Sequence, residues 1–132
     1  MAPLVLAYLG DAVYELEIRE RLVRRDHSRP ARLNRHASRL VCAAAQSQMA
    51  EVILPYLSEE EEAIYRRGRN AHSPTMAKNQ SVGDYRRATG FEALMGYLHL
   101  CGEITRMREL IQKGLEAFPE EHFEETSLHE IR

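Results

Sequence analysis

One acidic residue, Asp11, interrupts the most apolar stretch near the start of the chain, and this feature most constrains the fold. Apolar residues around it recur at the three- and four-residue spacings of an amphipathic helix. They are Leu6, Leu9, Val13, Leu16 and Val23. Asp11 is therefore expected to lie beside the core. An ionised carboxylate removed from water needs a cation, a basic side chain or several hydrogen-bond donors.

The residue before Asp11 is Gly10, and glycine inside a helix costs about 1 kcal/mol relative to alanine. A glycine in such a place indicates close approach by another backbone. The same combination recurs at Glu92, which lies in an apolar segment between Gly90 and Gly96. We hypothesise that these three glycines let two helices approach until the two acids bind one hard cation, Mg²⁺ or Mn²⁺. The alternative is that each acid forms a structural salt bridge with an arginine.

The chain has 132 residues, 44% of them hydrophobic, which suits one domain with a single core. We expect the folded domain to span residues 1–118 and the acidic residues 119–132 to form a flexible tail. No stretch resembles a membrane span or a signal peptide, so a cytoplasmic protein without a membrane partner is expected. Cys42 and Cys101 lie in helical patterns without metal-ligand spacing, which favours buried, reduced thiols.

Helical periodicity covers the chain and no segment alternates strictly, so the predicted fold class is all-α. Ser58 followed by Glu61 is a capping box that begins one of the helices. Gly102 ends another, and the polar, turn-forming residues 70–80 predict a loop. The expected helices span residues 4–25, 30–57 with a break near Ala45, 58–69, 81–101 and 103–118.

The formal net charge of −2 hides a strong segregation of charge along the chain. Residues 19–39 contain eight arginines and only two acids, a second basic group surrounds the expected loop, and acids gather in the tail. Basic side chains interleaved with hydrogen-bonding ones suit the phosphates and sugars of RNA, although a solvated helix face is the alternative. The residues predicted to bind RNA are Arg67, Arg69, Asn70, His72, Lys78, Arg86 and Arg87.

The sequence lacks the patterns of several other kinds of catalytic site. The chain has no His-Glu-x-x-His zinc motif and no pair of Glu-x-x-His helices for a di-iron centre. It also lacks a Gly-rich nucleotide loop ending in Lys-Ser or Lys-Thr, and a Gly-x-Ser-x-Gly elbow. The paired acids therefore remain the candidate catalytic centre.

Three motifs occur in order along the chain: AYLGDAVYE at residues 7–15, RGRNA at residues 67–71 and YRRATGFEAL at residues 85–94. Together they resemble the catalytic domain of the ribonuclease III family, and most closely its Mini-ribonuclease III branch. The resemblance extends to about Phe118. Three separate motifs at matching spacing make it more specific than one short pattern.

This resemblance implies an all-α, homodimeric endonuclease that cleaves double-stranded RNA with Mg²⁺, for which Mn²⁺ can substitute. It further implies action in bacteria on the ends of large-subunit (23S) ribosomal RNA precursors, with a ribosomal protein on the same RNA as a further partner. Asp11 and Glu92 occupy the positions of the family's catalytic, metal-binding acids. No double-stranded-RNA-binding domain follows residue 118, so affinity is expected to come from the catalytic dimer. The N-terminus looks shortened relative to the family.

The chain departs from the broader ribonuclease III pattern where Ala7 and Thr89 replace two further acids. Mini-type members resemble the chain there, so activity is still expected. The remaining metal ligands are then water, RNA or Glu15, which lies one helical turn after Asp11 on the same face. The missing acids support one alternative, a non-catalytic RNA-binding or ribosome-assembly module on the same scaffold. Another alternative, a helical protein-interaction domain, leaves the two acids beside glycines unexplained.

Overall fold

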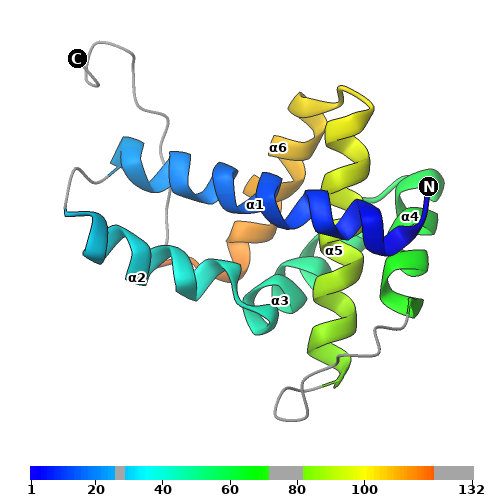
Figure 1. The fold of residues 1–132 in the computed structure, drawn as a ribbon, viewed down its shortest axis with the longest axis horizontal. Helices are drawn as coiled ribbons and strands as arrows, with labels where there is room; N and C mark the ends of the chain where they lie inside the picture. Colours follow the sequence, from blue (N-terminus) through cyan, green and yellow to red (C-terminus); the bar gives the residue numbers. More distant parts are fainter. Residues whose placement is uncertain (26–28, 72–81, 121–132) are drawn as a thin grey trace.

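A computed structural model of the chain describes residues 1–25, 29–71 and 82–120 (Figure 1). Within those residues every regular element is helical, which confirms the predicted fold class. The elements are α1 (Pro3–Arg25), α2 (Pro30–Val41), α3 (Ala43–Ile53), η1 (Leu54–Tyr56), α4 (Glu59–Asn70), α5 (Val82–Leu100), α6 (Ile104–Gly114) and η2 (Leu115–Ala117). None of these helices is long and apolar enough to cross a membrane. Almost all of the predicted loop and tail lies outside the described residues.

Local sequence signals set several helix ends. Ser58 accepts a hydrogen bond from the backbone N–H of Glu61 (3.1 Å), and the Glu61 carboxylate accepts one from the N–H of Ser58 (2.9 Å), so the predicted capping box begins α4. Gly102, with a φ of 73°, follows the end of α5. The predicted break near Ala45 is wrong in position. It falls at Cys42, whose backbone is extended, because the alanines that follow favour helix.

The two cysteines are free and exposed, contrary to the prediction of buried thiols. Both lie at helix ends: Cys42 separates α2 from α3, and Cys101 follows the last residue of α5. The helical periodicity that predicted burial does not extend through these junctions, which face solvent.

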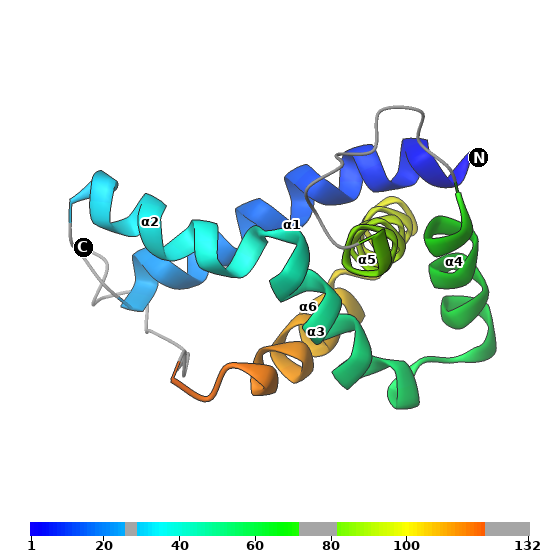
Figure 2. The ribbon, with the colours of Figure 1, turned by 90° about the horizontal axis from the view of Figure 1, so that it is seen from below.

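Helix α5 is the centre of the fold, with α1, α3 and α4 packed around it. Figure 2 views α5 nearly along its axis, and α1 and α4 lie on different sides of it. Its middle section is therefore buried on several faces, and Phe91, Leu94 and Met95 are fully enclosed. Helix α1 carries the first acid, Asp11, and α5 carries the second, Glu92.

Helix α1 crosses α5 where two glycines face the opposite backbone. A Cβ atom added to Gly10 would lie 1.7 Å from the carbonyl oxygen of Glu92, and one added to Gly96 would lie 2.1 Å from the carbonyl oxygen of Leu6. The two backbones therefore touch with no side chain between them. The predicted close approach is confirmed for Gly10 and Gly96.

Gly90 lies at the contact between α4 and α5, so the prediction that it lets α1 approach α5 is wrong. A Cβ atom on Gly90 would lie 2.7 Å from the carbonyl oxygen of Tyr65 in α4. Gly68 of α4 faces the same place, since a Cβ atom on it would lie 2.9 Å from the Cα atom of Gly90. The reason is helical geometry, because Gly90 and Gly96 are six positions apart and face different sides at 3.6 residues per turn.

Helix α1 exposes part of the apolar surface that was predicted to be buried. Leu6 and Val13 are in the core, whereas Leu16 is 64% exposed and Val23 is 53% exposed. The latter two face away from α5 and share one side of α1 with other apolar residues. We call this surface the α1 apolar stripe, and its members are Val5, Tyr8, Leu16 and Val23.

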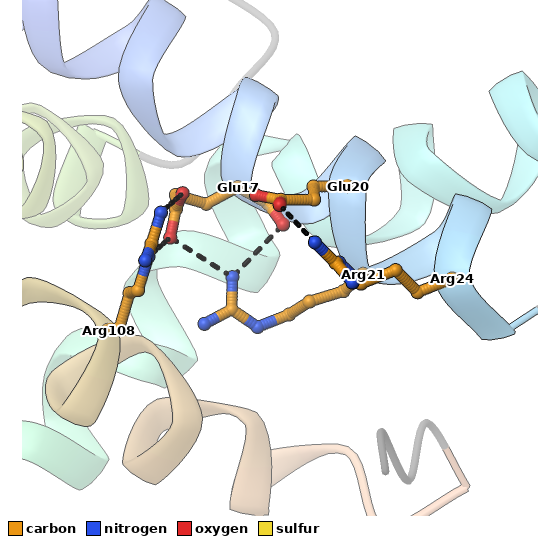
Figure 3. A network of polar contacts seen from close by, with 5 residues as sticks. All are labelled: Glu17, Glu20, Arg21, Arg24 and Arg108. Atoms are coloured by element: carbon orange, nitrogen blue, oxygen red, sulfur yellow. Dashed lines mark hydrogen bonds and ion pairs between the residues drawn. The ribbon is translucent and has the colours of Figure 1, made fainter. Parts of the chain in front are cut away.

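A buried carboxylate joins α1 to α6 (Figure 3). The side chain of Glu17 is only 5% exposed and accepts a hydrogen bond from Nε of Arg108 at 2.9 Å. Arg21, one turn along α1, lies 3.4 Å from the same carboxylate. Two guanidinium groups thus compensate the burial of this negative charge, and they hold α6 against the second half of α1.

The backbone contact at Gly10 predicts that Gly10→Ala lowers the free energy of unfolding by about 3 kcal/mol or more, because the helices must separate to admit a methyl group. Urea unfolding followed by circular dichroism measures this change. Gly83→Ala is the matched control, since its Cβ would meet only the flexible guanidinium of Arg87 at 3.2 Å. Its stability should be unchanged or slightly higher. Equal stability of Gly10→Ala and the unmodified chain would contradict the contact.

Candidate active site

The two predicted acids come together beside the crossing of α1 and α5. The backbone of Glu92 lies against Gly10, and the carboxyl groups of Asp11 and Glu92 share a hydrogen bond. Glu92 is half-buried, whereas Asp11 is exposed. The predicted burial of Asp11 beside the core is therefore wrong. Because Asp11 is one position past Gly10, it is turned about 100° from the contact and reaches Glu92 from the solvent side.

The proximity of the two acids changes the chemistry of Glu92. Burial, the hydrogen bond to Asp11 and the negative charge of Asp11 together raise the pKa of Glu92 to about 9. Near neutral pH the pair therefore holds one proton, since two adjacent carboxylates do not both ionise readily without a cation. A divalent cation would favour release of that proton. The donors are carboxylate oxygens, the ligands that Mg²⁺ and Mn²⁺ prefer, so the residues present fit such an ion.

The structural salt-bridge alternative predicted an arginine beside each acid. In the described part of the chain, no arginine or lysine forms an ion pair with Asp11 or Glu92. Glu17 shows the contrast, because its carboxylate is more deeply buried and is paired with two arginines. The acid pair is thus left available for a cation from solution.

A buried glutamine on α3 also contacts Glu92, and sequence reasoning missed it. Gln46 is 2% exposed, and its amide nitrogen donates a hydrogen bond to the carbonyl oxygen of Val41 (2.9 Å). Its side chain also lies close enough to the carboxyl group of Glu92 to lower the pKa of that group. A signal was present in the sequence, since Gln46 shares the helical spacing of Met49 and Ile53, which are fully buried. A polar residue in such a row requires an explanation.

The candidate third ligand, Glu15, lies apart from the acid pair. Its carboxylate forms an ion pair with Arg19 at 3.4 Å on the same helix. Among the described residues, no three His, Cys, Asp or Glu side chains are grouped closely enough to hold a metal ion. At the positions of the family's other acids, Ala7 is buried, and Thr89 is buried with its hydroxyl donating to the carbonyl of Tyr85 (2.9 Å).

The predicted RNA-binding residues of α4 lie at its C-terminal end. Arg67 and Asn70 are exposed. Arg69 is half-buried, donates to the side-chain oxygen of Asn70 at 3.3 Å, and lies 6.0 Å from the ring of Tyr65. This end of the helix therefore presents positive charge and hydrogen-bonding groups to solvent.

The predicted RNA-binding residues beyond α4 are less uniform. Arg87 is turned inward, where its Nε donates to Oγ of Ser47 (2.6 Å) and its Nη2 donates to a carboxylate oxygen of Asp84 (3.1 Å). Arg86 is half-buried. His72 and Lys78 lie outside the described residues. Part of the charge of Arg87 is consequently neutralised within the protein, which its sequence position did not reveal.

Comparison with known proteins gives consistent matches over most of the chain. The family model for the ribonuclease III domain matches residues 4–103. A Mini-ribonuclease 3 from Enterococcus faecalis is 52% identical over 110 residues, covering 82% of this chain and 83% of the relative. One from Clostridium tetani is 42% identical over 130 residues, covering 98% and 86%. A crystal structure of a protein from Fusobacterium nucleatum has a TM-score of 0.77 and 32% identity, covering 84% and 88%.

The raised pKa of Glu92 predicts that the stability of the metal-free protein falls as pH rises. The ordinary pKa of this carboxyl group is 4.5, and the folded chain raises it to about 9. Between these values the folded state binds more protons than the unfolded state, so the free energy of unfolding decreases with pH. Glu92→Gln removes this titration, and its melting temperature should increasingly exceed that of the unmodified chain as pH rises.

Differential scanning calorimetry in EDTA, from about pH 6 to about pH 9, measures this difference. Glu59→Gln is a suitable control, since Glu59 is exposed in the first turn of α4. A difference between Glu92→Gln and the unmodified chain that stays constant over the whole pH range would contradict the raised pKa.

Proposed function

The chain belongs to the ribonuclease III family, in its Mini-ribonuclease III branch, and is therefore an endoribonuclease; from this membership and the acid pair we propose that it cleaves double-stranded RNA with Mg²⁺ held by Asp11 and Glu92. The observation that carries the site assignment is the hydrogen bond between these two carboxyl groups beside the α1–α5 crossing. A carboxylate pair that meets no basic partner among the described residues suits a metal ion that acts on a phosphodiester.

The protein's part in catalysis is to supply and orient two ligands. Asp11 and Glu92 would hold Mg²⁺ or, in its place, Mn²⁺, which would supply activation of a water molecule and stabilisation of charge on the phosphate. Glu92 must release its proton to become a ligand, while Asp11 approaches from the exposed side that RNA can reach. Glu15 remains the proposed third ligand, and its recruitment would break its ion pair with Arg19.

The basic surfaces of the protein suit the phosphates of an RNA duplex. The arginines of α2 and its N-cap are exposed, namely Arg29, Arg32, Arg35 and Arg39. At the end of α4, Arg67 and Asn70 are exposed and Arg69 is half-buried. Such contacts neutralise phosphates and read duplex shape more than sequence, so we expect binding to weaken steeply with added salt.

We also propose that the active form is a homodimer in which a second copy covers the α1 apolar stripe. Tyr8 is 84% exposed and Leu16 is 64% exposed on this surface, on the helix that carries Asp11. Apolar residues gathered on one helix face favour association with a partner surface. A two-fold dimer would provide two acid pairs, one for each strand of a duplex.

The natural substrate that we propose is the ends of 23S ribosomal RNA precursors in the bacterial cytoplasm. A ribosomal protein bound to the same RNA is the proposed further partner. These finer assignments rest on the resemblance to the Mini-ribonuclease III branch, while the geometry of the acid pair supports the metal-dependent chemistry alone.

Incubation with duplex and single-stranded RNA tests the activity, and gel electrophoresis measures it. We expect Mg²⁺-dependent cleavage of the duplex only. Asp11→Asn and Glu92→Gln should each reduce the rate roughly a thousandfold, equivalent to about 4 kcal/mol of lost transition-state stabilisation. Glu20→Gln, a change on the same helix away from the pair, should leave the rate unchanged. Full activity in both acid variants would refute the site, and binding without Mg²⁺-dependent cleavage would favour the non-catalytic alternative.

Sedimentation equilibrium tests the dimer. Leu16→Glu places a charge within the α1 apolar stripe and should convert the dimer to a monomer, because burying an unpaired charge is costly. Leu100→Glu is the matched control, since Leu100 is also exposed (53%) but lies at the end of α5. A monomeric unmodified chain, or a Leu16→Glu variant that stays dimeric, would refute the proposed interface.

A further inference from the structure

Gln46 is a buried polar residue whose contacts converge on the acid pair. It lies on α3, which packs against α5, and its side chain is almost completely enclosed. The amide nitrogen donates to the carbonyl oxygen of Val41 at 2.9 Å. A carbonyl can only accept hydrogen bonds, so this contact fixes which end of the amide is nitrogen. The same side chain lies close enough to the carboxyl group of Glu92 to favour its charged form, which lowers the pKa of Glu92.

The other end of the amide is not satisfied. The Oε1 atom of Gln46 is buried and has no hydrogen-bond partner within the described protein. A buried acceptor without a donor costs about 1–3 kcal/mol. Methionine has a similar length and would fill the same space without this cost, so packing alone does not account for a glutamine at this position.

Glu92 is held from two directions. Its backbone carbonyl oxygen faces Gly10 on α1, and its carboxyl group is contacted by Asp11 from α1 and by Gln46 from α3. Groups that hydrogen-bond a metal ligand orient it, and their loss typically weakens metal binding by about 10- to 100-fold. The location of Gln46 therefore matches that of a group supporting a metal ligand.

We propose that Gln46 is a positioning residue that orients the carboxylate of Glu92 toward Asp11 for metal binding. The inference rests on the proposed function, because it takes Glu92 to be a metal ligand. It assigns to α3 a direct part in the site, which otherwise comes from α1 and α5. The unsatisfied Oε1 atom is the stability cost of this arrangement.

Gln46→Met tests the proposal, because it keeps the length of the side chain and removes its hydrogen bonds. Gln48→Met is the matched control, since Gln48 is exposed two residues later on α3. Three quantities are measured for each protein: the melting temperature in EDTA, the affinity for Mn²⁺ alone by calorimetry, and the Mg²⁺ concentration that gives half-maximal cleavage of duplex RNA.

For Gln46→Met we expect an unchanged or higher melting temperature, a Mn²⁺ dissociation constant raised about 10- to 100-fold, and a similar rise in the half-maximal Mg²⁺ concentration. Saturating Mg²⁺ should restore most of the cleavage rate. Gln48→Met should match the unmodified chain in all three quantities. Unchanged Mn²⁺ affinity in a folded Gln46→Met variant would overturn the proposal.

A second variant, Gln46→Leu, separates a structural role from a positioning role. Loss of folding in both variants would show that the glutamine is needed for the fold and would overturn the proposal. If the unmodified chain binds Mn²⁺, Gln46→Met weakens that binding, and no duplex is cleaved, the proposed function fails while the role of Gln46 stands. If the unmodified chain and Gln46→Met cleave the duplex with the same Mg²⁺ dependence, the proposed function stands and the role of Gln46 is refuted.

Discussion

The contact between the backbones of α1 and α5 is the constraint on which the rest of the structure depends. At Gly10 and Gly96 the two helices approach without an intervening side chain, and this proximity brings Asp11 to Glu92. The same central helix meets α4 through Gly68 and Gly90. The fold thus uses small residues at both crossings, and the position of the acid pair follows from the packing of the core.

The carboxylates of Glu17 and Glu92 are both removed from solvent, but their surroundings differ. Glu17 is deeply buried and compensated by Arg21 and Arg108, so it stabilises the junction of α1 and α6. Glu92 is less buried, yet burial and Asp11 raise its pKa to about 9. The chain has many arginines, but none in its described regions forms an ion pair with Asp11 or Glu92. This difference separates a carboxylate that supports the fold from one suited to bind a cation.

Much of the fold was predictable because helices are encoded by local patterns. Apolar periodicity predicted the fold class, and the Ser58–Glu61 capping box predicted the start of α4. The pairing of Asp11 with Glu92 was predictable because two apolar helices repeated the same combination of acid and glycine.

The remaining features depend on tertiary contacts that a local pattern does not contain. Periodicity identified an apolar face on α1 but could not say that Leu16 turns away from the core. The direction faced by Gly90 follows from the place of α4, and the inward turn of Arg87 follows from Ser47 on α3. Gln46 shares the spacing of a core residue, and its contact with Glu92 depends on how α3 packs against α5, which a local pattern does not contain.

The order of the helices along the chain has a consequence for the time at which the enzyme becomes active. Asp11 lies in the first helix, whereas Glu92 lies in the fifth. During synthesis the ribosome therefore releases half of the proposed metal site long before the other half exists, and the crossing that joins them forms only after α5 emerges. Under the proposed mechanism, a nascent chain cannot cleave RNA until nearly the whole domain has been made.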